Sequence, residues 1–106
     1  MEKHELFLKA IQEKKILQIR FKSFEKGPIS RKCIPFDFGP SRRSKDQSDK
    51  YHFYDLDSPE GSHVLSILPE QLLEAELLEE SFTPESYVTW PGPYEWFIKR
   101  DWGSKS

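Results

Sequence analysis

The sequence predicts a mainly β domain: a small, partly open barrel of five short strands that follows one N-terminal helix. Three observations lead to this fold class. The chain opens with an apolar stripe at helical spacing, turn signals then separate segments rich in β-branched and aromatic residues, and 106 residues is the length of one domain. Because a chain of this length buries only a modest core, we expect no large internal catalytic cavity.

The helix is expected over residues 3–14, KHELFLKAIQEK. Its apolar positions recur at i, i+3 and i+4 spacing with lysine and glutamate between them, and they are Leu6, Phe7, Ala10 and Ile11. From Ile16 to Phe24 the period changes to two, and β-branched and aromatic residues concentrate. This change of period predicts that the first strand follows the helix directly.

A second strand is expected at Arg31–Phe38, after the turn signal Lys26-Gly27-Pro28. Pro35 lies inside this run, and proline lacks the donor that a strand ladder needs, so it indicates an edge position or a bulge. The stretch GPSRRSKDQSDK, from Gly39 to Lys50, has no large apolar residue and predicts a long loop.

Strands three and four are expected at Tyr51–Leu56 and His63–Leu68, with a turn at Ser58–Gly61 between them. This spacing predicts a hairpin. In the third strand Tyr51 and Phe53 share one face while His52 and Tyr54 share the other, so one of these pairs faces the core.

Residues 69–72 predict a single helical turn, and residues 74–82 supply a fifth strand. A helix over residues 70–80 is the alternative, because Leu and Glu are good helix formers. One helix followed by five short strands and a long loop suits a barrel of the SH3 or Sm type.

The chain is expected to divide into the barrel with its helix, residues 1–83, and an irregular aromatic extension, residues 84–106. The extension carries six large aromatic side chains, Tyr87, Trp90, Tyr94, Trp96, Phe97 and Trp102. So much apolar area must be covered. We expect it to wrap back over the barrel or to form an interface with another subunit or protein, with Trp90, Trp96, Arg100 and Trp102 as the interaction residues.

Charge and composition limit the function classes. A net charge of −2 argues against general affinity for phosphate backbones, although a local basic patch remains possible. One cysteine, Cys33, cannot form an internal disulfide, and no apolar run is long enough for a membrane span or a signal peptide. We therefore expect a soluble, cytoplasmic protein.

Catalytic and metal chemistry find little support in the sequence. His4, His52 and His63 do not fall in a metal-ligand spacing, and a single cysteine is too few for a structural zinc site. Neither a serine elbow nor a Cys-His pair is indicated, and the glutamates of LLEAELLEES form one run typical of a solvated face. We expect no metal, no cofactor and no enzymatic activity.

The order of these signals resembles the WYL domain family. The resemblance covers residues 4–83, about three quarters of the chain, and rests on five pieces in order: Leu8-x-x-Ile11, Ile16-x-x-Ile19-x-Phe21, Arg31-x-x-x-Pro35, the strand KYHFYDLD, and LLEAELLEESF ending at Phe82. Where the family has its Trp-Tyr-Leu triplet, this chain has Tyr51-His52-Phe53. The family also typically carries arginines shortly before the position of Leu72, and here the sequence is LSILPEQ.

The resemblance implies an SH3-like barrel of the kind found in bacterial transcription regulators, where it senses nucleotide or nucleic-acid ligands. Because only about fifteen residues precede the first strand, we expect a stand-alone, non-enzymatic domain that passes regulation on through a partner protein. The expected ligand-binding residues are Arg31, whose guanidinium can grip a phosphate, Tyr51 and Phe53, which could stack a base, and Arg42 and Arg43 in the loop.

Two further readings remain open. Arg31 can instead form a structural ion pair with Asp37 or a nearby glutamate, and the loop arginines can simply be solvated. The alternative function is a protein interaction module or homo-oligomer that uses the aromatic tail or a barrel edge and has no small ligand.

Overall fold

The structure, a computed structural model, describes residues 2–25, 27–41, 47–59, 61 and 63–106. Helix α1 (Lys3–Glu13) comes first and is followed by the strands β1 (Lys15–Ser23), β2 (Gly27–Pro40), β3 (Asp49–Asp55), β4 (His63–Ile67) and β5 (Leu72–Ser81). A 3-10 turn, η1 (Pro69–Gln71), lies between β4 and β5, and the short helices α2 (Pro84–Tyr87) and η2 (Gly103–Lys105) lie in the tail.

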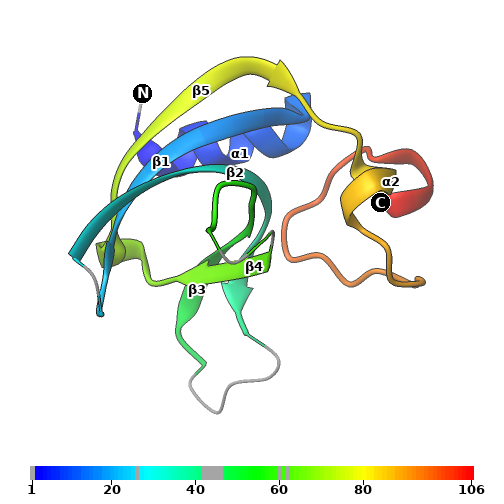
Figure 1. Cartoon of the computed structure of the whole chain (residues 1–106). Coiled ribbons are helices and arrows are strands. Elements are labelled where there is room, and N and C mark those ends of the chain that lie inside the picture. The colour runs from blue at the N-terminus through cyan, green and yellow to red at the C-terminus, as the bar shows by residue number, and fades with distance from the viewer. Residues whose placement is uncertain (1, 26, 42–46, 60, 62) are drawn as a thin grey trace.

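The five strands form one antiparallel sheet in the order β4-β3-β2-β1-β5, which curls around the core (Figure 1). Helix α1 packs against β1, β2 and β5. The predicted mainly β fold with an N-terminal helix is thereby confirmed. Because β4 and β5 lie at the two ends of the strand order, they are the edges of the sheet.

The helix ends in a tight reversal that sends the chain straight into β1. Lys14 adopts the left-handed conformation with φ 57°, and its N–H bonds back to carbonyl oxygens of the last turn. The apolar stripe predicted from the sequence becomes the buried face of α1, where Phe7, Ala10 and Ile11 are fully covered. This short connection holds the helix against the sheet that follows it.

Residues 72–81 form a strand, so the helical alternative for residues 70–80 is wrong. Leu77 pairs with Leu17, Ala75 with Ile19, and Leu72 with Phe21. Two register shifts interrupt this ladder, which explains why the alternation of apolar residues looked poor in the sequence. The ladder to β1 outweighs the helix preference of Leu and Glu, because tertiary context overrides weak local propensity.

Strand β2 is longer than predicted and lies in the middle of the sheet. It runs over Gly27–Pro40 instead of Arg31–Phe38, and its position between β1 and β3 excludes the edge alternative for Pro35. The register with β3 shifts between Pro35 and Asp37, so the bulge alternative is confirmed. The predicted loop is correspondingly shorter, because Gly39–Pro40 and Asp49–Lys50 belong to strands.

Strands β3 and β4 pair as the predicted hairpin, with Phe53 opposite Leu65. The core lies between the inner face of the sheet and α1. Its fully buried members include Phe7, Ile11, Leu17, Ile19, Phe53 and Ile67. Helix and sheet therefore share one core.

The tail folds back and lies beside the sheet, past the end of β5 (Figure 1). Two short helical turns, α2 and η2, correct the expectation that this segment contains no regular element. Trp102 joins the core with 1% of its surface exposed. None of the helices in the described part of the chain is long and apolar enough to cross a membrane.

Candidate functional site

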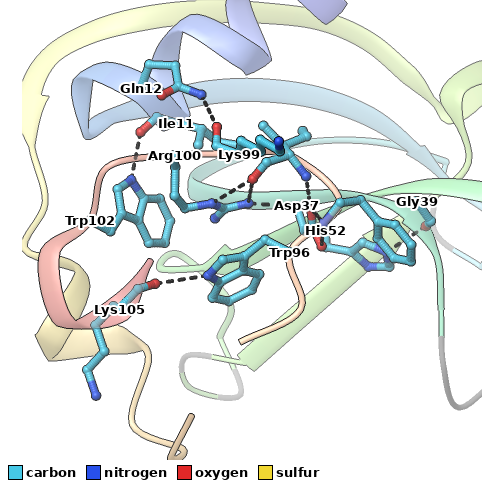
Figure 2. A network of polar contacts seen from close by, with 12 residues as sticks. Ile11, Gln12, Asp37, Gly39, His52, Trp96, Lys99, Arg100, Trp102 and Lys105 are labelled. Atoms are coloured by element: carbon cyan, nitrogen blue, oxygen red, sulfur yellow. Dashed lines mark hydrogen bonds and ion pairs between the residues drawn. The ribbon is translucent and has the colours of Figure 1, made fainter. Parts of the chain in front are cut away.

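The tail is fastened to the sheet by a buried ion pair between Asp37 on β2 and Arg100. The Arg100 Nη2 lies 3.4 Å from Asp37 Oδ1, and the two side chains are 0% and 9% exposed. The same carboxylate accepts backbone N–H groups of Phe97 at 3.1 Å and Ile98 at 3.1 Å. One carboxylate therefore binds both a cation and two amides of the tail (Figure 2).

Two indole rings enclose the Arg100 guanidinium. Its Cζ lies 4.2 Å from the ring centroid of Trp96 and 4.3 Å from that of Trp102, a geometry in which the cation faces the negative ring surfaces. The Trp102 Nε1–H donates to the carbonyl oxygen of Ile11 at 2.9 Å, and the Trp96 Nε1–H donates to Lys105 O at 2.9 Å (Figure 2). Each indole thus satisfies its polar group, and the ring of Trp102 is also buried.

Burial lowers the pKa of Arg100 to about 10, against the opposing effect of Asp37, which raises it. The guanidinium stays charged at neutral pH, so its charge must be compensated inside the protein. Asp37 and the Ile98 carbonyl oxygen bind Nη2 and Nε. Within the described residues, however, the buried Nη1 has no hydrogen-bond partner.

A partly exposed cluster of aromatic rings lies on the outer side of this network. We call Phe36, Trp90, Tyr94 and Trp96 the aromatic patch. Phe36, Trp90 and Trp96 contact one another edge to face with centroids 6.2–6.3 Å apart, and Tyr94 stacks on Trp96 at 5.6 Å. Trp90 remains 42% exposed after the tail has folded.

An apolar crevice lies between the outer side of β2 and β3 and the tail. Its free volume is only about 10 Å³, and its lining includes Ile34, Tyr54, Tyr87, Trp90 and Trp102. The crevice is therefore almost filled by its own side chains, and its apolar lining does not suit a phosphate. The crevice extends the apolar character of the patch toward α2.

Tyr51 and Phe53, the predicted stacking residues, are core residues. Phe53 is 0% and Tyr51 5% exposed, and both rings contact Phe7 of α1 edge to face. The Tyr51 hydroxyl lies 2.8 Å from His4 Nδ1. In this packing neither ring presents a face on which a base could stack.

The other face of β3, which carries His52 and Tyr54, is also packed against the rest of the protein. His52 is buried, its Nε2–H donates to the carbonyl oxygen of Gly39 at 2.8 Å, and its Nδ1 accepts from the Ser66 hydroxyl at 2.7 Å. The imidazole therefore links β2, β3 and β4. Tyr54 is partly exposed and contacts Tyr87 of α2.

Arg31 pairs with Asp55, with Nε 3.5 Å from Oδ2, whereas the sequence suggested Asp37 or a glutamate as its partner. Arg31 on β2 lies near the end of β3 that carries Asp55, and Tyr51 lies near the other end of β3. The register shows this, because Cys33 pairs with Asp55 while Phe38 pairs with Tyr51. The structure therefore does not bring Arg31 together with Tyr51 and Phe53 in one open site. Arg42 and Arg43 lie outside the described residues.

Other cations near Arg31 are also paired with carboxylates. Lys32 Nζ lies 2.9 Å from Glu80, which raises the lysine pKa, and Arg20 lies 3.6 Å from Glu74. Paired charges give little net positive potential along β1, β2 and β5. In the part of the chain that the structure describes, no three His, Cys, Asp or Glu side chains gather as a metal site would require.

The predicted interaction residues divide into two groups. Trp90 and Trp96 lie in the aromatic patch, whereas Arg100 and Trp102 are buried beneath it. Sequence reasoning missed Asp37 as the partner of Arg100. The sequence does hold one sign of this pair: Asp37 is the single carboxylate inside the apolar run CIPFDF. A charged group that is buried in a strand needs a partner of opposite charge.

Comparison with protein-family models and with curated proteins finds no match to this chain. The resemblance to the WYL family therefore stays a prediction from the sequence.

Proposed function

We propose that the chain is a protein interaction module whose contact surface is the aromatic patch. The observation that carries this proposal is Trp90, a large indole that stays 42% exposed although the tail around it is folded. Tryptophan and tyrosine are enriched at the centres of protein interfaces, where they supply most of the binding free energy. The apolar crevice beside Trp90 continues this apolar surface toward α2.

A protein partner fits this surface better than a nucleic acid does. Platforms for single-stranded nucleic acids combine stacking aromatics with a positively charged groove. Here Arg31 and Lys32 are paired with Asp55 and Glu80, and the chain carries a net charge of −2. The regulatory role that the WYL resemblance implies would be exercised through the bound protein.

The test is site-directed photo-crosslinking from Thr89, an exposed residue next to Trp90. A crosslinking amino acid at this position should capture a defined partner in cell extract, and Trp90→Ala should remove that product. Phe24→Ala is the matched control, because Phe24 is 78% exposed at the far end of β1 and should leave the product unchanged. The proposal fails if Thr89 captures no more protein than the exposed Glu25 does.

The competing function is the binding of a nucleotide or oligonucleotide through Arg31. It is measured by tryptophan fluorescence during titration with short single-stranded DNA and RNA at low and near-physiological salt. Saturable binding that weakens with salt and disappears in Arg31→Ala would replace the protein-interaction proposal, because phosphate contacts carry a salt dependence.

A further inference from the structure

We propose that the surface beneath the tail is a recognition site for a peptide segment in which a tryptophan is followed four residues later by arginine and two residues after that by a second tryptophan. Residues 96–102 fill this site in cis, and a partner protein's segment of the same chemistry can fill it in trans. We call the site the tail seat and define it by Ile11, Phe36, Asp37 and Phe82. The inference goes beyond the aromatic patch, with which it shares Phe36 and Trp96, because it concerns the surface under the tail.

Each side chain of the motif contacts a group that belongs to the helix or the barrel. Trp96 contacts the Phe36 ring at 6.2 Å, Arg100 binds Asp37, and the Trp102 indole donates to the Ile11 carbonyl oxygen at 2.9 Å. The Trp102 ring also packs edge to face on Phe82 at 5.5 Å. The seat thus has three separate subsites, two aromatic and one anionic.

The anionic subsite requires a cation. Asp37 is 6% exposed, and a buried carboxylate without a counter-charge is strongly unfavourable. A guanidinium fits because its Nη2 binds the carboxylate while its central carbon lies against both indoles, 4.2 and 4.3 Å from the ring centroids, whereas a lysine ammonium is a compact point charge. The carboxylate of the seat therefore favours an arginine, and the segment's own two indoles pack against that guanidinium.

The attachment of the tail to the seat can be exchanged. Residues 89–102 belong to no helix or strand, so no ladder of backbone hydrogen bonds joins them to the sheet. The buried Arg100 Nη1 also has no hydrogen-bond partner within the described residues, and an unsatisfied buried donor weakens the docked state. A partner segment that carries an acceptor for this N–H would compete with the chain's own tail.

The probe is a fluorescent synthetic peptide of residues 90–106, titrated into the full-length chain with the double substitution Arg100→Ala and Trp102→Ala. We expect saturable binding to this variant. Binding to the wild-type chain should be weaker by at least about tenfold, because a tethered tail competes at an effective concentration on the order of millimolar.

Matched substitutions assign the binding to the seat. Arg100→Ala in the peptide, or an added Asp37→Asn in the chain, should weaken binding by at least about tenfold. Lys99→Ala in the peptide and Asp49→Asn in the chain should leave binding unchanged, because both positions are exposed. The inference is overturned if the peptide does not bind the folded double variant, or if Lys99→Ala and Arg100→Ala peptides bind equally.

A second experiment tests the inference if the double variant does not fold. A protease site is inserted after the exposed Thr83 of the otherwise wild-type chain, and the tail is cut after folding. The labelled peptide should then displace the cut fragment, seen as fluorescence that co-elutes with the barrel. A fragment that stays bound without exchange, or a barrel that loses it and takes up no peptide, contradicts the inference.

Discussion

The indole N–H of Trp102 donates a hydrogen bond to the carbonyl oxygen of Ile11, 91 positions earlier in the chain. This contact joins the last helix turn of α1 to the tail, and the indole is 1% exposed. The C-terminal segment is therefore part of the core and not an appendage to it. Several consequences for stability and chemistry can be measured.

Trp102→Ala should destabilise the fold strongly. The substitution removes a buried indole and leaves a cavity, and losses of about 3–5 kcal/mol are typical of such changes. The free energy of unfolding from urea denaturation measures the effect. Trp90→Ala is the control, because Trp90 is 42% exposed and its loss should cost clearly less. Equal losses in the two variants would show that the tail is not part of the core.

Removing Asp37 should be equally damaging, for an electrostatic reason. Asp37→Ala leaves the buried Arg100 charge and two backbone N–H groups without their acceptor, and breaking a buried pair costs about 3–5 kcal/mol. The double variant Asp37→Ala, Arg100→Met should recover part of this loss in a double-mutant cycle. Glu13→Gln, which breaks the exposed pair with Lys9, should change the free energy of unfolding by less than about 0.5 kcal/mol.

Cys33 should be unreactive in the folded protein. The thiol is fully buried, and burial, assisted by Asp55 and Asp57, raises its pKa well above the ordinary range. The reactive thiolate is therefore scarce at neutral pH. Labelling with a coloured disulfide reagent should be slow in buffer and rapid in urea, with one equivalent released per chain. Fast labelling under native conditions would contradict the burial of β2.

Tyr51 should make stability depend on pH in the alkaline range. Burial raises the pKa of its phenol above the ordinary value of 10.0, so the unfolded chain loses this proton first. The contribution of Tyr51 is constant below pH 10, and the free energy of unfolding then falls as the pH rises toward the folded-state pKa. Tyr51→Phe should show a shallower fall between pH 9 and 11. An unchanged slope would mean that the hydroxyl is solvated.

The sequence by itself determined the fold class and most elements. The helical spacing of Phe7, Ala10 and Ile11 marks the buried face of α1, and the change of period at Ile16 marks β1. These signals are local, because each depends on which side chains share one face of one element. The hairpin of β3 and β4 and the 3-10 turn at Pro69 follow from local turn signals in the same way.

Only the tertiary structure decided how the site is assembled. Residues 72–81 form a strand because they pair with β1. Asp37 binds Arg100, which lies 63 positions later in the chain, and Arg31 pairs with Asp55. Such partners depend on long-range packing that has no local signature. The aromatic content showed that the tail had to be covered, but only the folded arrangement shows that Trp102 lies inside and Trp90 remains outside.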